Sequence, residues 1–281
     1  MSRLPTLVTV GGLLFVTACS SPTDLDPTES CIGESGDART AFEDPALEAA
    51  VKEALGVAAS ADLTCGSMSS VTALDASDAG VTSLQGIQNL VNLRNLHLNG
   101  NALDDLTPLS GLGILHTLFI RSSGLTSLDG LQGLTSLDFL DLNDNSIGDV
   151  GPLAGLNGLI FLDLTENQIG DVGPLSGLTV ALSLRLGANS VSDIGALSGL
   201  ASVVTLSLYG NDITDLTALA ALPRLATLDL SDNVALSDIQ PLVDNSALGD
   251  GDTVGLRGTA VDCPSVAALR AKGVIVDYGC V

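Results

Sequence analysis

Residues 134–155 read LTSLDFLDLNDNSIGDVGPLAG, and residues 156–177 read LNGLIFLDLTENQIGDVGPLSG. Of the 22 positions in each block, 15 are identical between the two. The unit recurs along the chain, with anchor leucines 22 residues apart at Leu90, Leu112, Leu134, Leu156, Leu178, Leu200 and Leu222. A repeat this short cannot bury a core alone, so the pattern predicts a solenoid in which each block packs against its neighbours.

Each block combines a short alternating stretch with a turn. In Leu140-Asp141-Leu142 the leucines face inward and the aspartate outward, which is typical of a β-strand with one buried face. Asn145 follows where a side-chain amide can bond backbone groups that the turn leaves unpaired. Equivalent asparagines stand at Asn101, Asn167, Asn189, Asn211 and Asn233, and the position is taken by Ala79 and Ser123 in two repeats, where the ladder should be weaker. A return leg of 3-10 or extended structure is expected to begin at Pro108, Pro152, Pro174 and Pro241.

These residues follow the pattern L-x-x-L-x-x-L-x-L-x-x-N-x-I-x-D-I-x-P-L, which resembles the leucine-rich repeat family in its 22-residue, internalin-like class. The resemblance covers eight repeats in residues 68–244 and a degenerate ninth around residues 253–261. It implies an α/β solenoid with a parallel sheet on the concave face and 3-10 or extended convex segments. It also implies a non-enzymatic protein that binds a protein partner, in some cases for adhesion. The alternative is a structural or assembly role in the cell envelope, binding glycans or other envelope proteins.

Residues 1–18 resemble a bacterial lipoprotein signal peptide, with Arg3, an apolar run over residues 4–16, and Cys19 after Val-Thr-Ala. A lipid on Cys19 would be the only membrane attachment, and Ser20 after it favours the outer membrane. The alternatives are an ordinary secretory signal or an N-terminal membrane helix, although the apolar run is short for a span. Residues 19–38 are rich in Ser, Pro, Thr, Gly and acids, so they predict a flexible acidic tether.

The segments that flank the repeats read as caps. Residues 39–67 predict a helical N-terminal cap, with Asp44 capping a helix over residues 40–55. Residues 245–281 predict a degenerate repeat and a C-terminal cap with a helix over 264–272 and a closing strand at 274–276. An extra residue within 233–236 predicts a bulge. In an oxidising compartment the economical cysteine pairing is Cys31–Cys65 and Cys263–Cys280, one disulfide in each cap; the alternative is free or metal-binding thiols, although no C-x-x-C spacing is present.

The composition restricts the function. A formal net charge of −23 with scattered basic residues argues against a nucleic-acid partner. The two histidines, His97 and His116, lie outside any catalytic motif, so we expect neither catalysis nor a cofactor or metal site, and a monomeric protein. The strings at residues 141–145 and 250–252 resemble the start of calcium loops but lack the closing ligands, which leaves calcium as a hypothesis.

The outward strand positions give the candidate site. Three of the phenylalanines fall on the concave face of consecutive repeats, where neighbouring strands are about 4.8 Å apart. In a chain with few aromatic residues, such a cluster predicts a partner-binding hot spot with a polar rim; the alternative is that the rings only pack on each other across strands. The candidate partner-binding residues are Phe119, Phe139 and Phe161, with Asp141, Asp163, Arg121 and Arg185 as the rim, and Tyr209 and His97 in the same columns. An apolar patch favours a protein partner, whereas a wholly polar surface would favour the glycan or scaffold role.

Overall fold

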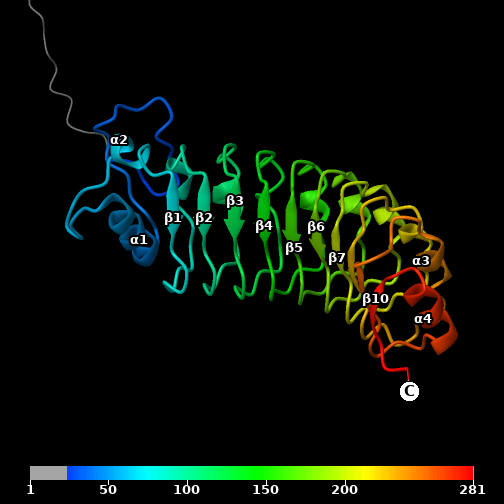
Figure 1. The fold of residues 1–281 in the computed structure, drawn as a ribbon. Coiled ribbons are helices and arrows are strands. Elements are labelled where there is room, and N and C mark those ends of the chain that lie inside the picture. Colours follow the sequence, from blue (N-terminus) through cyan, green and yellow to red (C-terminus); the bar gives the residue numbers. More distant parts are fainter. Residues whose placement is uncertain (1–23, 281) are drawn as a thin grey trace, which may run out of the picture.

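The computed structural model describes residues 24–280, which form a curved solenoid (Figure 1). The predicted signal peptide and the predicted lipidation site at Cys19 lie outside the described residues. One parallel sheet contains ten strands in chain order: β1 Ala73–Asp75, β2 Asn95–His97, β3 Thr117–Phe119, β4 Phe139–Asp141, β5 Phe161–Asp163, β6 Ser183–Arg185, β7 Thr205–Ser207, β8 Thr227–Asp229, β9 Thr253–Gly255 and β10 Ile275–Asp277. The predicted leucine-rich-repeat arc is confirmed.

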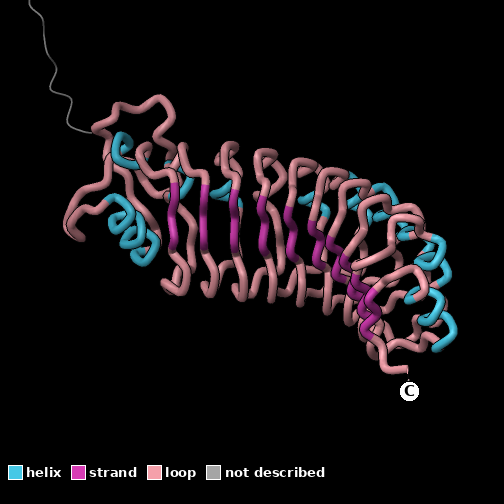
Figure 2. Tube along the Cα trace, viewed as in Figure 1, coloured by secondary structure: helices cyan, strands magenta, loops and turns pink. Residues whose placement is uncertain are grey.

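The return legs lie on the outer side of the curve and the strands on the inner side (Figure 2). Six of the legs form 3-10 segments: η1 Ile87–Asn89, η2 Thr107–Leu109, η3 Gly151–Leu153, η4 Gly173–Gly177, η5 Gly195–Gly199 and η6 Thr217–Leu219. In the eighth repeat, Pro241 lies in a short α-helix, α3 Gln240–Asp244, instead of a 3-10 segment. Because the legs are wider than the strands, stacking the units bends the sheet inward on its strand side.

The strands are stacked without any shift in register. Leu140 pairs with Leu118 on one side and with Leu162 on the other, and all three are fully buried. An equivalent buried leucine or valine stands in the middle of every strand, so the core is one continuous column from cap to cap. Side chains on either side of this central position therefore point to the concave surface.

The predicted asparagine ladder is present. Asn145 Oδ1 accepts the N–H of Leu125 at 3.0 Å, and its Nδ2 donates to the carbonyls of Ile120 and Leu142 at 2.8 and 2.9 Å. One amide thus satisfies backbone groups of neighbouring turns, and the pattern recurs at Asn101, Asn167, Asn189, Asn211 and Asn233. Ser123 replaces part of it, since its hydroxyl donates to the Arg121 carbonyl at 2.9 Å.

The residue just before each ladder position adopts a left-handed backbone. It is glycine in some repeats but carries a side chain at others, including Glu166 (φ 57°) and Ala188 (φ 51°). The repeat pattern does not predict this backbone conformation, because these residues donate their N–H groups to carbonyls of the next repeat, as Glu166 does to Gly187.

The N-terminal cap contains α1 Pro45–Leu55, which begins after Asp44 as predicted and ends at Gly56. Asp44 is 6% exposed, and its second carboxylate oxygen accepts the N–H of Thr82 at 2.7 Å, which joins the cap to the first return leg. A second helix, α2 Cys65–Met68, follows a capping box at Thr64.

The prediction of a flexible tether is wrong for residues 24–38. Leu25 and Ala38 are buried, and Cys31 forms a disulfide with Cys65, with a Cα–Cα distance of 5.5 Å. The Cys31 N–H also donates to Asn89 Oδ1 at 2.7 Å. The polar composition suggested a free segment, but the disulfide and these few contacts are enough to hold it on the first repeat.

The C-terminal cap closes the other end. The predicted degenerate repeat supplies β9, and α4 Cys263–Arg270 begins one residue earlier than predicted, after an Asp262 cap. Cys263 and Cys280 form the second disulfide, with Cα atoms 5.7 Å apart. Val234 is 72% exposed on a turn, which fits the extra residue expected there.

Candidate functional site

The sheet register separates the three candidate phenylalanines. Phe139 pairs with Phe161 across β4 and β5, but Phe119 pairs with Asp141. Phe119 instead stacks on His97, with ring centroids 4.8 Å apart and planes 6° from parallel. The three rings share the concave face as expected, but Phe119 stands two positions further along its strand than Phe139 and Phe161 and packs on His97 instead of on them.

Asp141 and Asp163 are not exposed rim residues as predicted, since only 1% and 6% of their surfaces remain accessible. Each accepts the N–H two residues further on, from Asn143 at 3.2 Å and from Thr165 at 3.0 Å. The local turn therefore satisfies one carboxylate oxygen, and the charge requires a cation from another repeat.

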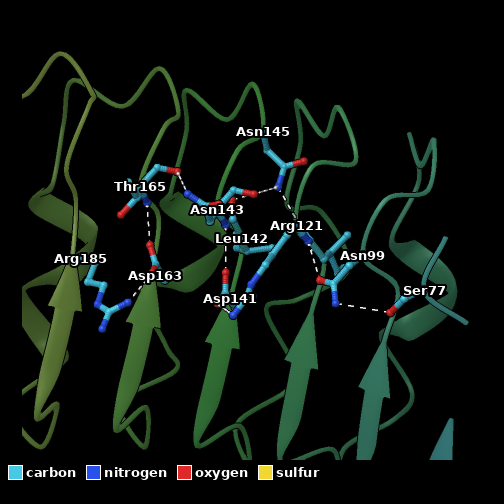
Figure 3. A network of polar contacts seen from close by, with 11 residues as sticks. Ser77, Asn99, Arg121, Asp141, Leu142, Asn143, Asn145, Asp163, Thr165 and Arg185 are labelled. Atoms are coloured by element: carbon cyan, nitrogen blue, oxygen red, sulfur yellow. Dashed lines mark hydrogen bonds and ion pairs between the residues drawn. The ribbon is translucent and has the colours of Figure 1, made fainter. Parts of the chain in front are cut away.

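Arg121 and Arg185 supply these cations from opposite sides (Figure 3). Arg121 Nη2 lies 2.5 Å from Asp141 Oδ2, and Arg185 Nη1 lies 3.3 Å from Asp163 Oδ2. The hydrogen bond to Asp141 raises the pKa of Arg121, against the opposing effect of burial. The four side chains form a row across repeats three to six, which we call the arginine–aspartate row.

The two guanidinium groups are half-exposed and lie over aromatic rings. The Arg121 carbon Cζ is 5.5 Å from the ring centroid of Phe119, and that of Arg185 is 5.3 Å from the ring centroid of Phe161. These are cation–π distances. Phe119 and Phe161 therefore pack against the guanidinium groups of Arg121 and Arg185.

The arginine–aspartate row lines a hollow of about 470 Å³ on the concave face, together with Asn143, Thr165, Glu166, Ser207 and Tyr209. Tyr209 leans over Gly187, where an added Cβ would lie 2.1 Å from its Cε1 atom. Burial, followed by the charges of Glu166, Asp163 and Asp229, raises the pKa of the Tyr209 hydroxyl. The structure thus brings five of the predicted residues together around one hollow, while His97 stays outside it beside Asp75.

An apolar strip borders this hollow at the opposite ends of the strands. Phe139, Val180 and Leu182 are 42%, 46% and 42% exposed, and Ile160 and Phe161 lie half-buried. The N–H of Leu182 bonds to the Ile160 carbonyl at 2.9 Å, which places the two side chains in neighbouring repeats. The outward strand columns do not contain Ile160, Val180 or Leu182. Ile160 and Leu182 stand in the column one residue before the strands, where they could have been recognised from the sequence.

A hollow of about 540 Å³ lies between the return legs, lined in part by Asp193 and Asp215. Both carboxylates already accept backbone N–H groups of their own turns at 2.8 Å. No aromatic or basic side chain lines this hollow, so we regard the concave hollow as the candidate site.

Within residues 24–280, no group of three or more His, Cys, Asp or Glu side chains could hold a metal ion. His116 bonds to Asp138 at 2.9 Å, and Arg94 lies 3.4 Å from its other ring nitrogen, on a flank of the sheet. The helices found in these residues are also too short and polar to cross a membrane.

Comparison with known proteins places the repeats in a family. The family model described as leucine rich repeats matches residues 135–177 and 201–244. The crystal structure of internalin C2 from Listeria monocytogenes is 34% identical, with a TM-score of 0.70, over 84% of this chain and 94% of that chain. The internalin InlF of the same organism is 30% identical, with a TM-score of 0.68, over 85% and 78% of the two chains.

A leucine-rich repeat protein of Leptospira interrogans shares the fold, with a TM-score of 0.67 at 22% identity over 76% of this chain and 56% of that chain. A search of curated protein sequences finds no match. Because internalin C2 is matched over nearly its whole length, the chain belongs to the internalin-like leucine-rich repeat proteins.

Proposed function

We propose that this protein recognises a protein partner on its concave face and the adjoining edge of the sheet, through the arginine–aspartate row and the apolar strip at the strand starts. Leucine-rich repeat proteins in general bind other proteins. The observation that supports this site is the exposure of Phe139, Val180 and Leu182 in repeats four to six, with the half-buried Ile160 and Phe161 in repeat five. Soluble proteins seldom expose contiguous large apolar side chains unless a partner covers them.

The composition of the surface favours a protein over a glycan. This face combines an apolar strip with half-exposed arginines over aromatic rings, whereas a wholly polar surface would favour the glycan or scaffold role. Aromatic and arginine side chains are enriched among the residues that dominate binding energy at protein interfaces. The glycan-binding and scaffold roles are therefore the alternative that the experiment below tests against.

Position on the cell envelope is part of the proposal. Two disulfides favour an exported protein. The lipobox ending at Cys19 adds a lipid anchor, and Ser20 favours the outer membrane. Replacing Cys19 with Ala should move the protein from the membrane fraction to the soluble fraction and remove incorporation of labelled palmitate; a protein that stays on the membrane would refute lipid anchoring.

The binding face can be tested with a matched pair of surface variants. A photo-reactive amino acid at position 139 should crosslink a protein partner in intact envelopes, whereas the same group at the exposed Val234 should not. Adding Leu182→Ser should reduce this crosslinking by about tenfold, which is a typical cost for truncating an apolar interface residue. Equal crosslinking from both positions would refute recognition on the concave face, and glycan capture unaffected by removal of protein would support the alternative.

A further inference from the structure

We propose that the concave hollow takes one carboxylate side chain of the protein partner, held between Arg121 and Arg185. This assignment rests on the proposed function and names the chemical group that the site would recognise. It follows from which hydrogen-bonding groups in the hollow are already used and which remain free.

The two arginines keep most of their donors. Each guanidinium group has five N–H groups in a planar fork. The structure uses one terminal nitrogen of each arginine for Asp141 or Asp163, and about half of each side chain remains exposed. The ion pair and the ring beneath hold each guanidinium in place, so little conformational entropy is lost when a ligand binds.

The charges of Asp141 and Asp163 are already compensated. Each carboxylate accepts one backbone N–H and pairs with one arginine, and both are nearly inaccessible to solvent. They fix the arginines without presenting a free carboxylate to a ligand. A basic side chain entering the hollow would meet two guanidinium groups whose free N–H groups it cannot bond.

The hollow also holds three hydroxyl groups, each able to donate or accept a hydrogen bond. Within residues 24–280 the hydroxyl groups of Thr165, Ser207 and Tyr209 make no side-chain hydrogen bond to the protein, and all three residues line the hollow. Together with the arginines they suit a group that only accepts hydrogen bonds. An ionised carboxylate has this property and fits the planar guanidinium fork.

Glu166 restricts the charge of the ligand. Its exposed carboxylate lies on the rim, in the left-handed turn after β5. With Glu166 included, the hollow is lined by three acidic and two basic side chains, so the lining repels every anion, and one with several negative charges more strongly than a single carboxylate. The arrangement therefore favours a single carboxylate and predicts that Glu166 weakens its binding.

The apolar strip identifies the source of this carboxylate. Phe139 lies in repeat four and Leu182 in repeat six, so the apolar strip runs across repeats four to six at the strand starts, along one side of the hollow. A partner segment that contacts both Phe139 and Leu182 must continue past repeat five in both directions, which a chain end placed there cannot do. Phe161 in the strip and Asp163 in the hollow are two strand residues apart, or about 7 Å, which is the distance that the acidic side chain must span.

The test uses three blocked pentapeptides with leucines at both ends, serines at positions two and four, and glutamate, glutamine or lysine in the middle. A fourth peptide carries the central glutamine and a free C-terminal carboxylate. Binding is followed by NMR on the 15N-labelled protein at the Nε–Hε signals of Arg121 and Arg185, assigned from arginine variants. We expect the glutamate peptide to shift both signals and to bind at least about tenfold more tightly than the glutamine peptide, the usual scale for a charge-assisted hydrogen bond.

Three variants make the result specific. Glu166→Gln should tighten binding of the glutamate peptide severalfold. The double variants Arg121→Met/Asp141→Asn and Arg185→Met/Asp163→Asn remove each charge pair together, so the fold is retained while binding falls to the level of the glutamine peptide.

The assignment is overturned if the glutamate and glutamine peptides bind equally, if neither binds, if the lysine peptide binds more tightly, or if Glu166→Gln weakens binding. Preference for the free C-terminal carboxylate would overturn the side-chain source. The crosslinking experiment at position 139 has an independent readout, so protein recognition can hold while the carboxylate assignment fails.

Discussion

The concave strand ends and the convex return legs carry aspartates that are locally alike. Asp141 and Asp149 belong to one repeat, and each accepts the N–H two residues further on, at 3.2 and 2.7 Å. Yet Asp141 is buried beneath Arg121, whereas Asp149 stays exposed. The next repeat has the same contrast between Asp163 and Asp171.

The difference shows that a short-range turn does not decide what an acidic residue does in a solenoid. On the concave side, neighbouring strands bring side chains from successive repeats close together, so a carboxylate is enclosed and needs a cation. On the convex side Asp149 and Asp171 are exposed, so solvent can reach the second oxygen. Asp141 and Asp163 therefore hold the arginines of the proposed recognition surface in place, whereas Asp149 and Asp171 only accept hydrogen bonds within their own turns.

The largest effect on stability is expected when an arginine of the concave side is removed. Arg121→Met leaves Asp141 buried with a backbone N–H but no cation, and we expect a loss of about 2–3 kcal/mol in the free energy of unfolding. This loss is small for a broken buried ion pair, because the arginine is half-exposed and water can reach the site. Urea unfolding measures the loss. Arg121→Met/Asp141→Asn should restore most of it, and a single variant as stable as the wild type would show that the pair is unimportant.

Asp44 offers a contrast to Asp141 and Asp163, because it is buried without pairing with an arginine. Burial opposes its ionisation, but hydrogen bonds from Thr82, Ala46 and Ser83 outweigh this and lower its pKa below the ordinary value. A lowered folded-state pKa stabilises the fold above the unfolded pKa of about 3.9, and the contribution is lost as the pH falls through the folded value.

Asp44→Asn should therefore cost about 1–2 kcal/mol at pH 7, since an amide NH₂ would face N–H donors. It should also flatten the decline of stability below pH 4, measured by urea unfolding at several pH values. Asp149→Asn is the control, because this exposed side chain on a return leg can still accept the Gly151 N–H through its amide oxygen. An unchanged pH profile in Asp44→Asn would contradict the assigned role.

Gly187 tests how closely the concave side is packed. Gly187→Ala places a methyl group where the Tyr209 ring lies, so the ring must move out. We expect a cost of about 1 kcal/mol for the overpacked contact. Because burial is the main cause of the raised pKa of Tyr209, that pKa should fall toward the ordinary tyrosine value. Spectrophotometric titration in a Tyr278→Phe background measures it, and an unchanged pKa would mean that Tyr209 does not rest on Gly187.

The smallest effect is expected on the convex side. Asp149→Asn keeps an oxygen that accepts the Gly151 N–H, and the side chain is solvated, so the change should stay within about 0.5 kcal/mol. Asp171→Asn should behave in the same way. Urea unfolding beside Arg121→Met gives the contrast directly. Losses as large as that of Arg121→Met would remove the distinction between the two sides.

Much of the fold was predictable because its signals are local and repeated. Leu140 and its equivalents define the core, Asn145 and its equivalents define the ladder, and Asp44 marks the helix start. The tether over residues 24–38 was mispredicted because composition does not register a disulfide to Cys65 or a hydrogen bond to Asn89.

The candidate site was predictable only in part. The outward columns identified the arginines and the aspartates, but not their pairing across repeats. Phe119 was grouped with Phe139 and Phe161 because they share a face, whereas the register places it beside Asp141. Leu182 and Val180 were missed because their exposure depends on how the loops before the strands pack.

The repeat length, the parallel sheet, the caps and the choice of cysteine partners can be read from the sequence, because each depends on spacing along the chain. Which acids are buried, which arginine pairs with which aspartate and where the apolar strip lies follow from the tertiary structure alone. These depend on contacts between side chains 20 or 22 residues apart, such as Arg121 with Asp141 and Arg185 with Asp163. Side-chain length, register and the inward curvature of the stack set those contacts together.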